Sequence, residues 1–424
     1  MRRHEKNLGL RRGWLAALLG VALLLPGAAQ ALTLEEALRL AVANNPAIQA
    51  SRTQISQNKA QEITAGLRPN PVLSWDAQYV PVFSPSKFST DTLDTLQQFD
   101  VGIGTLIERG GKRGRRLEAA RDQTHVTEAQ IEDMERALQY NVAQQFVAAL
   151  LAQSNLEFAL SDLESFQKTV RINEDRFQSG DISKNDYLII KVQLLQFQND
   201  VNAARLAKAQ ALTSLRQLVG YDSVPRDYDV EGKLACQPVS AGLDDLQALA
   251  LRERPDLRAA QLGIAAAGSQ VALAKANGKQ DLNVTFDYSH VSQASTGSVF
   301  FSLPLPVFNR NQGEIERSRF AHTQAELTHK AAEETVLTDV RNAWEGLESS
   351  GEIVKLYESG YLKDAGDSRE ISEYAYRQGA VALLDFLDAE RSYRTIQLAY
   401  RQSVASYMLS LEQLRQAAGT RSLP

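Results

Sequence analysis

The sequence predicts a mainly α-helical, elongated protein with a small β part. Three observations predict this fold class: an internal duplication, a helical stretch too long for a compact domain, and short segments in which apolar and polar residues alternate. The 424 residues are 44% hydrophobic, so the chain has ample apolar surface to bury. Its net charge of -5 argues against a nucleic-acid partner, because a nucleic-acid-binding chain would be basic.

The duplication has a long period. The segment 34–38, Leu-Glu-Glu-Ala-Leu, is matched roughly 200 positions later by 243–247, and 46–50 is matched by 255–259 at the same spacing. Between the copies, the chain loses the helical pattern and is interpreted as a linker. We therefore divide the chain into a first repeat over 32–220, a linker over 221–242, a second repeat over 243–416 and a C-terminal tail over 417–424.

The N-terminal segment 1–31 is typical of a cleaved secretory signal. Basic residues precede an uncharged stretch over 13–31 that ends in Ala29-Gln30-Ala31, which is the order of an export signal and its cleavage site. The apolar run over 14–25 is too short to cross a bilayer as a helix. We expect cleavage after Ala31 and export, with an uncleaved anchor or a twin-arginine signal as weaker alternatives.

Each copy is expected to contain very long helices. Apolar residues between Leu117 and Phe177 recur at near-heptad spacing, and a helix of that extent would be a rod of about 90 Å. Gly180 and Gly379 are predicted to end a helix in each copy, because glycine readily adopts the left-handed conformation found at helix ends. The expected helices are 34–67, 112–178 and 184–219 in the first copy, and 243–277, 312–377 and 381–416 in the second.

Each copy is also expected to contain two strands. In the first strand, Leu73 and Trp75 alternate with Ser74 and Asp76, which gives one apolar and one polar face. Such strands suit either a soluble sheet with one solvated face or a water-filled membrane barrel. Four strands cannot close a membrane barrel, so a barrel would need several chains, and three copies would supply twelve strands around a lumen. The expected strands lie near 72–80, 98–107, 281–289 and 298–307.

Several short motifs accompany the duplicated plan. They are residues 33–38 with Asn45-Pro46, the Arg176-Phe177-x-x-Gly180 turn, and Gly379 followed by 384–389. In this combination the chain resembles the TolC-like outer-membrane efflux proteins, or outer membrane factors, over essentially all of its length after the signal segment. The segments 107–114 and 303–315 resemble the CzcC-like branch, which is associated with efflux of divalent heavy-metal ions.

The resemblance implies an elongated homotrimer in the outer membrane of a Gram-negative bacterium. A shared twelve-stranded transmembrane β-barrel, surrounded by outer-membrane lipid, would continue as a twelve-helix coiled-coil tunnel across the periplasm. The implied partners are a periplasmic adaptor (membrane fusion protein) and an inner-membrane pump of the resistance-nodulation-division (RND) class. The chain would be a passive exit duct, not an enzyme, and would hold no cofactor. The alternatives are the same duct serving drugs or other small molecules, a periplasmic coiled-coil adaptor, and a soluble periplasmic enzyme.

At the periplasmic end the resemblance implies a constriction. Asp385 and Asp388 match the constriction carboxylates, Asp186 is the repeat-related acid, and Tyr376 matches a tyrosine of the closing network. Val381 stands where drug-exporting members carry an arginine, so we expect the closing network to be wired differently. On physical grounds, Asp385 and Asp388 share a helix face and would form rings of like charge around a threefold axis. The alternative is a pair of solvated acids stabilised by the helix dipole.

Two further surfaces are predicted. The helix turns are expected to face the adaptor and the pump through Arg176, Phe177, Gly180, Arg377 and Gly379. A basic cluster directly after a strand is expected at the periplasmic boundary of the membrane, with a solvated helix start as the alternative. This cluster consists of Lys112, Arg113, Arg115 and Arg116.

No motif in the sequence indicates catalysis, redox chemistry or tight metal binding. Cys236 is the single cysteine, so it cannot form an intramolecular disulfide or a paired thiolate site. His322 and His329 would share a helix face, but a surface pair is the more common arrangement for two such histidines. No nucleophile with an adjacent base and no cofactor loop is present. We therefore expect a duct that conducts ions without binding them tightly.

Overall fold

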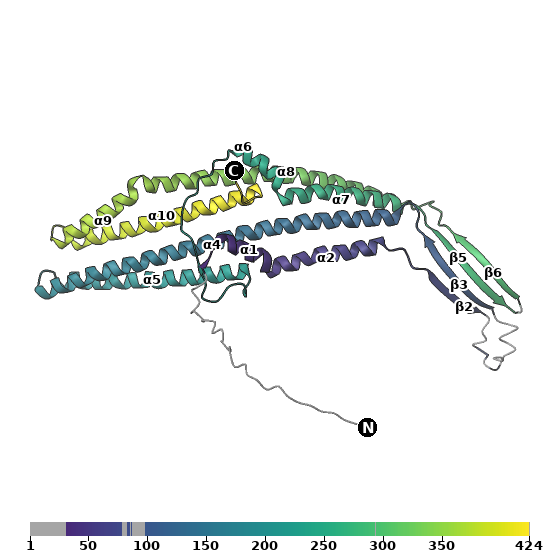
Figure 1. Ribbon diagram of the computed structural model, residues 1–424, viewed down its shortest axis with the longest axis horizontal. Helices are drawn as coiled ribbons and strands as arrows, with labels where there is room; N and C mark the ends of the chain where they lie inside the picture. Colours follow the sequence, from purple (N-terminus) through teal and green to yellow (C-terminus); the bar gives the residue numbers. More distant parts are fainter. Residues whose placement is uncertain (1–30, 79–82, 85, 87–97, 293, 424) are drawn as a thin grey trace, which may run out of the picture.

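The structure is a computed structural model and describes residues 31–78, 83, 84, 86, 98–292 and 294–423. Figure 1 shows an elongated molecule in which long helices run side by side, with a sheet at one end and helix turns at the other. The fold is mainly α with a small β part, as predicted. Apart from Ala31, the expected signal segment lies outside the described residues.

Two copies of one element order make up the described chain. The first contains α1 (Leu34–Asn44), α2 (Pro46–Gly66), β2 (Val72–Gln78), β3 (Gln98–Ile107), α4 (Lys112–Ser179) and α5 (Lys184–Val219). The second contains α6 (Leu243–Glu253), α7 (Pro255–Asn277), β5 (Leu282–Val291), β6 (Ala294–Ser302), α8 (Gln312–Leu356), α9 (Leu362–Arg377) and α10 (Leu383–Ala418). The 68 residues of α4 form a rod of about 100 Å, which makes the molecule long.

The helix expected over 34–67 is broken at Pro46, so the prediction of one continuous helix was wrong. Proline lacks the N–H group of a helical hydrogen bond and disfavours helical backbone in the residue before it. Asn45 is accordingly extended, with ψ of 121°. Its Oδ1 accepts a hydrogen bond from the Ala47 N–H at 2.9 Å, and its Nδ2 donates to the Leu218 carbonyl at 2.9 Å. Asn45 thus begins α2 and ties the break to α5.

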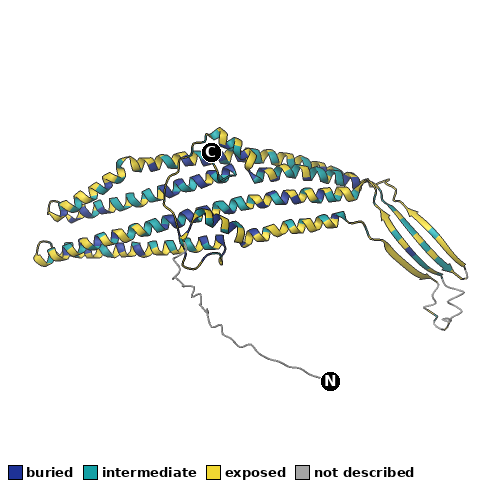
Figure 2. Cartoon of the chain, in the orientation of Figure 1, coloured by how far each residue is buried: buried dark blue, intermediate teal, exposed yellow. Residues whose placement is uncertain are grey.

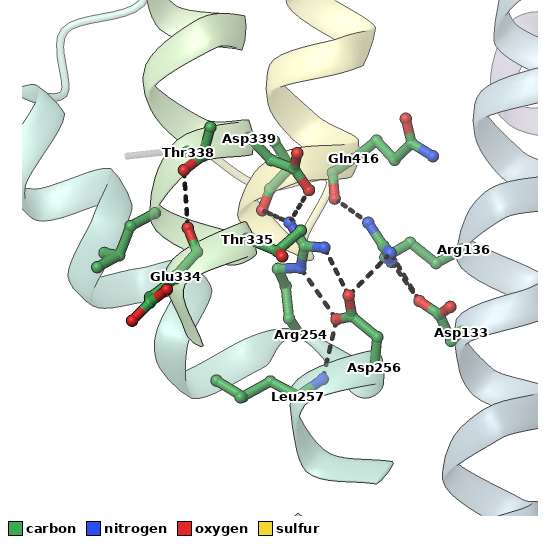
Figure 3. A network of polar contacts seen from close by, with 12 residues as sticks. Asp133, Arg136, Arg254, Asp256, Leu257, Glu334, Thr335, Thr338, Asp339 and Gln416 are labelled. Atoms are coloured by element: carbon green, nitrogen blue, oxygen red, sulfur yellow. Dashed lines mark hydrogen bonds and ion pairs between the residues drawn. The ribbon is translucent and has the colours of Figure 1, made fainter. Parts of the chain in front are cut away.

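The helix expected over 243–277 is broken in the same way, with a different side chain at the break. Arg254 is only 4% exposed, and its guanidinium contacts both carboxylate oxygens of Asp256 and, at 2.9 Å, one oxygen of Asp339 (Figure 3). Asp256 also lies 3.7 Å from the Arg136 guanidinium of α4. The break therefore connects α7 with α8 and α4 near the middle of the rod.

The helix expected over 312–377 is interrupted by a π-helical turn, Tyr357–Tyr361, between α8 and α9. Gly360 has φ of +146° in this turn, a conformation that residues with a side chain rarely adopt. In Figure 1, α9 bends away from the line of α8 at this point. The heptad spacing that predicts the helix carries no signal of this kink. The next helix, expected over 381–416, begins at Leu383 and continues to Ala418, into the expected tail.

The linker expected over 221–242 is packed into the fold. It carries β4 (Asp229–Val230), which pairs in parallel with β1 (Ala31–Leu32). Tyr228 is buried, and its hydroxyl donates a hydrogen bond to the Leu212 carbonyl of α5 at 2.5 Å. The linker therefore covers the core of the first copy, although its sequence lacks the pattern of a regular element.

The sheet at the far end is antiparallel, with strand order β2-β3-β5-β6. β6 ends at Ser302, so the strand expected near 298–307 starts and ends earlier than predicted, and Leu305 lies outside it. Residues 79 and 80 of the first expected strand lie outside the described residues. The strands β2 and β6 each have one neighbour in the described sheet, so both edges are open.

The register aligns like residues in rows across this sheet. One apolar row consists of Leu73, Ile103, Phe286 and Val299, and the polar row beside it consists of Ser74, Gly102, Asp287 and Ser298. Because neighbouring residues of a strand point to opposite faces, one face of the sheet is apolar and the other is polar. The alternation expected from the sequence is therefore carried across all four strands.

The described core consists of separate clusters spread along the rod (Figure 2). One cluster joins α1, α4 and α5 with the short β1–β4 pair, and a second joins α6, α8 and α10. A third lies close to the helix turns, between α4, α5, α9 and α10. Within the described residues, no helix combines the length and the apolar composition needed to cross a membrane.

Much of the apolar stripe that predicts the long helices is exposed in the single chain. Val192 is 69% exposed, Leu206 is 59% exposed and Ile371 is 67% exposed. Apolar side chains left exposed in this way are available for contact with another protein chain. The helices of a single chain therefore leave part of their apolar surface uncovered.

Candidate functional site

The turn between α4 and α5, which we call the first helix turn, begins with a glycine that ends α4. Gly180 has φ of +85°, and the Asp181 N–H returns to the Arg176 carbonyl at 2.8 Å. Glycine adopts this left-handed conformation without steric cost, so it is suited to end the helix. Ser183 caps the start of the next helix, α5, and its Oγ accepts a hydrogen bond from the Asp186 N–H at 3.1 Å. The turn is therefore short and capped on both sides.

The second helix turn repeats the first. Gly379 has φ of +76°, and the Ala380 N–H donates to the Ala375 carbonyl at 2.8 Å. At the start of α10 the Asp385 carboxylate accepts the Ala382 N–H at 3.2 Å. The two turns lie together at the same end of the molecule (Figure 1). They present a compact tip made of four helix ends.

The three acids predicted for the constriction all lie at helix starts of this tip. Asp385 and Asp388 are exposed on the first turns of α10, and the only ion pair of Asp388 among the described residues is a 3.8 Å contact with exposed Arg391. Asp186 lies in the first turn of α5 and accepts a hydrogen bond from the Ser183 hydroxyl at 2.9 Å. Both carboxylates of α10 are exposed at the tip, where Asp385 caps its helix and Asp388 contacts Arg391.

Tyr376 lies inside the tip. It is 5% exposed, and its hydroxyl donates to Asn173 Oδ1 of α4 at 2.8 Å. Its ring stacks on Phe386 at 5.5 Å, and the Arg176 guanidinium lies 5.4 Å from the ring centre. Burial raises the pKa of Tyr376. The Tyr376 hydroxyl thus makes its hydrogen bond within one chain, where it joins α9 to α4. Asp186 is not its hydrogen-bond partner.

Among the residues predicted to face the adaptor and pump, the three with long side chains make contacts within the chain, whereas the two glycines border open space. Phe177 stacks on Tyr187 across the first turn, with ring centres 5.1 Å apart, so it stabilises the turn. Arg377 forms an ion pair with Glu373 on the surface of α9. The side chain of Arg176 points back to the Tyr376 ring. Gly180 and Gly379 leave space around their Cα atoms, since an added Cβ would meet no atom within 4 Å.

A buried ion network lies between the four helices that lead to the tip. Asp162 of α4 is 5% exposed and lies 2.8 Å from Arg394 of α10, which also contacts Asp200 of α5. Glu390 of α10 is 4% exposed and lies 2.6 Å from Arg369 of α9. Burial and the neighbouring Glu390 carboxylate raise the pKa of Asp162 to about 7. This network connects α4 and α5 with α9 and α10, and one member, Asp162, changes charge near neutral pH.

The predicted basic cluster lies where the sheet meets the helices, and its members are bound within the chain. Lys112 Nζ lies 2.6 Å from Asp281, and burial opposes ionisation of Asp281 while Lys112 lowers the pKa of that carboxyl. The other contacts are those of Arg116 with Glu108, Arg115 with Glu118, and Arg113 with the Gly66 carbonyl. These charges hold α2, α4 and the strands together.

The polar face of the sheet is acidic. Asp76 lies directly opposite Asp100, and Asp287 follows on the next strand. Side-chain amides accompany the first two acids, with Gln78 donating to Asp76 at 3.3 Å and Gln98 donating to Asp100 at 2.7 Å. Directly opposed like charges destabilise a sheet, so this face is suited to water and to cations.

The described residues contain no group of three or more histidine, cysteine, aspartate or glutamate side chains placed to hold a metal ion. His322 lies 3.6 Å from Glu326, and His329 lies 3.9 Å from Glu333, so each histidine is paired along its own helix. Cys236 is exposed in the linker.

Similarity to known sequences agrees with this geometry. The profile of the family described as outer membrane efflux protein matches residues 37–221 and 246–420. The chain belongs to the outer membrane efflux protein family. The matched segments fall on the two copies of the fold, and the family consists of passive outer-membrane channels of tripartite efflux systems in Gram-negative bacteria rather than enzymes. Membership excludes the alternatives of a periplasmic adaptor and a soluble enzyme.

Among curated members of the outer membrane efflux protein family, the chain is similar to two metal-efflux proteins. It is 23% identical to the cobalt-zinc-cadmium resistance protein CzcC of Cupriavidus metallidurans over 375 residues, covering 88% of this chain and 86% of that protein. It is 24% identical to the cation efflux system protein CusC of Escherichia coli K12 over 315 residues, covering 70% and 68% of the two chains.

Solved channels of the outer membrane efflux protein family share the fold. A crystal structure of CusC superposes with a TM-score of 0.75 at 20% identity, over 91% of this chain and 92% of that chain. The open MtrE outer membrane channel of Neisseria gonorrhoeae superposes with a TM-score of 0.73 at 17% identity, over 91% and 89% of the two chains.

Sequence reasoning missed the buried ion network. Asp162 lies four residues before Phe166 and on the same buried side of α4, so an acid within an apolar stripe was the available signal. The basic residues in their partners' helices carried no such signal, because exposed and buried arginines look alike in a sequence. Sequence reasoning also missed a group of basic residues near the sheet, which consists of Arg109, Lys275, Lys279 and Arg310.

Proposed function

We propose that three copies of this chain form the exit duct of a tripartite efflux system that exports divalent heavy-metal cations. The duct would receive its cargo from an inner-membrane RND pump through a periplasmic adaptor. It would conduct passively, with the helix turns as its periplasmic entrance. The acids Asp385 and Asp388 would form the narrowest rings, with Asp186 beside them.

The four-stranded sheet carries this proposal. It has an apolar face, a polar face and two open edges, and an open edge in lipid would leave backbone hydrogen bonds unsatisfied. Three copies joined edge to edge would close twelve strands with the apolar face toward lipid. The same threefold arrangement would cover the exposed apolar stripe of the helices. One threefold assembly would thus cover both the open edges of the sheet and the exposed apolar stripe of the helices.

Charge supports cations as the cargo. Asp76, Asp100 and Asp287 line the polar face of the sheet, and Asp385 and Asp388 lie exposed at the tip. Acids at both ends of a duct raise the local concentration of cations and repel anions. The names of the similar proteins CzcC and CusC refer to cation resistance and efflux. Drug or other small-molecule efflux through the same duct is the alternative cargo.

Metal tolerance tests the cargo. A strain lacking this protein should tolerate lower concentrations of one or more of zinc, cobalt, cadmium, nickel and copper, while its tolerance of drugs and dyes is unchanged. The full-length chain supplied in trans should restore growth on the affected metals. Loss of drug tolerance with normal metal tolerance would establish the alternative cargo instead.

A further inference from the structure

A cationic pocket lies where the sheet meets the helices. The cavity has a volume of about 790 Å³, and its lining includes four basic residues from three segments of the chain. Leu303, Pro304 and Ile315 supply apolar parts of the wall. We call this cavity the junction pocket. Its basic residues are Arg109, Lys275, Lys279 and Arg310.

Close backbone packing brings these cations together. Gly110 has φ of +73°, and a Cβ added there would lie 2.8 Å from Lys279 Cγ. A Cβ added to Gly278 would lie 2.6 Å from the Arg310 carbonyl oxygen. Asn311 Nδ2 donates to the Ala274 carbonyl at 2.7 Å and holds the start of α8 against the end of α7. The pocket is thus built by contacts that leave no room for side chains at the two glycines.

The side chains of the basic residues of the junction pocket form no ion pair with a carboxylate among the described residues, and Arg109 contacts Asp281 only through its backbone N–H, at 2.9 Å. The carboxylates nearest in sequence are engaged elsewhere, with Asp281 paired to Lys112, Glu108 to Arg116 and Glu314 to Arg317. Among the described residues, the one side-chain hydrogen bond of these four is from Arg310 Nε to the Pro306 carbonyl at 3.0 Å. Lys275 also lies in the last turn of α7, where the helix dipole favours a cation. The helix dipole therefore accounts for the position of Lys275 but not for the other three basic residues.

The pocket borders the apolar face of the sheet. On β3 this face includes Ile103 and Ile107, and Arg109 follows two residues after Ile107. On β6 it includes Phe301, and the exposed side chains of Leu303 (41%) and Leu305 (77%) follow in the same alternation. Cations therefore lie directly beyond the apolar surface, on the side of the helices. A ligand that fits both surfaces has an anionic head and an apolar tail.

We propose that the junction pocket binds the phosphate headgroup of an anionic phospholipid from the periplasmic leaflet of the outer membrane. The phosphate would be held by Arg109, Lys279 and Arg310, and the acyl chains would lie along the apolar face of the sheet. Arginine and lysine are the side chains that bind phosphate most strongly. This inference rests on the outer-membrane location of the family and does not depend on the cargo.

Thermal stability of the purified full-length protein in detergent tests the proposal. Phosphatidylglycerol should raise the Tm more than phosphatidylcholine with the same acyl chains, because only the former carries a net negative charge. The triple variant Arg109→Gln, Lys279→Gln, Arg310→Gln should bind phosphatidylglycerol more weakly, by on the order of a hundredfold. A matched control, Arg205→Gln, Lys355→Gln, Lys363→Gln, removes three exposed charges far from the sheet and should bind as wild type.

Three results would overturn the proposal. One is equal binding of phosphatidylglycerol by the wild type and the triple variant, and another is equal stabilisation by phosphatidylcholine. The third is equal stabilisation by inorganic phosphate, which would make the pocket a site for small anions. If the triple variant does not fold, the single variant Lys279→Gln, at an exposed position, should weaken binding about fivefold, and unchanged binding would count against the proposal. The assay contains no metal, adaptor or pump, so its outcome is independent of the proposed cargo.

Discussion

Two aspartates in this chain show how the surroundings of one residue set its charge. Burial opposes ionisation of Asp256, but the hydrogen bonds and charge of Arg254 lower its pKa. Asp162 is buried, and the neighbouring carboxylate of Glu390 adds to the effect of burial. The pKa of Asp162 therefore rises to about 7 despite nearby Arg394. One acid therefore stays ionised at the middle of the rod, while the other accepts a proton near neutral pH.

At the residue scale, we predict that Asp162 makes stability depend on pH. Between about pH 4 and 7 the folded chain keeps a proton that the unfolded chain loses, so the free energy of unfolding falls as pH rises. The change should be on the order of 4 kcal/mol. Asp162→Asn should remove this dependence, measured as the difference in Tm between pH 5 and pH 8.

The exposed acid Asp367 of α9 provides the control for this measurement. Asp367→Asn should retain the wild-type dependence on pH, since the side chain lies at the surface. The same Tm difference in Asp162→Asn and wild type would show that another group is responsible.

At the element scale, the two copies solve one problem with different chemistry. Each must break a helix before a proline near the middle of the rod. The first copy uses the neutral cap of Asn45, which bonds to α5, whereas the second uses the buried charge of Arg254, which bonds to Asp256 and Asp339. Removal of a neutral cap leaves no charge behind, but removal of the buried arginine takes away the cation that contacts Asp339 and leaves Asp256 with the 3.7 Å contact to Arg136.

This difference predicts unequal costs of mutation. Asn45→Ala should lower the free energy of unfolding by about 1 to 2 kcal/mol. Arg254→Met should cost more, about 3 kcal/mol, which is the low end for a broken buried pair because Asp339 is partly exposed. Denaturant unfolding of the two variants in detergent measures both values. Equal costs, or a larger cost for Asn45→Ala, would contradict this account of the two breaks.

At the scale of the whole molecule, the single chain is incomplete. Its sheet has open edges and its long helices expose apolar side chains, while Asp385 and Asp388 lie exposed at the end of the rod. In the proposed trimer, each exposed acid would be repeated three times around one axis. Like charges held around an axis attract cations and repel each other.

Assembly therefore predicts a selectivity that one chain does not have. In planar bilayers, Asp385→Asn with Asp388→Asn should lower the permeability of cations relative to anions by about threefold or more, because two rings lose their charge. Asp244→Asn with Asp245→Asn removes the same charge from α6 and should leave selectivity unchanged. An unaltered permeability ratio in the tip variant would exclude the ring.

Local patterns predicted much of the fold. The extents of α4 and α5 agree with the predicted helices to within a residue or two, because heptad spacing and a terminal glycine are properties of adjacent residues. The positions of Asp385 and Asp388 at a helix start followed from the same reasoning. The breaks at Pro46 and Pro255 also had a signal in the sequence, because proline disfavours helical backbone in the residue before it, yet each expected helix extended across its proline.

The sequence by itself determined the duplication, the long helices, the alternating strands and the glycine turns, since each depends on the order of neighbouring residues. Only the tertiary structure decided which distant side chains meet. It paired Asp162 with Arg394, placed Tyr376 against Asn173 and left the side chain of Arg109 beside that of Lys279 with no ion pair among the described residues. Such contacts depend on how helices and strands far apart in the chain pack together, and one residue's charge or burial is fixed only when that packing is known.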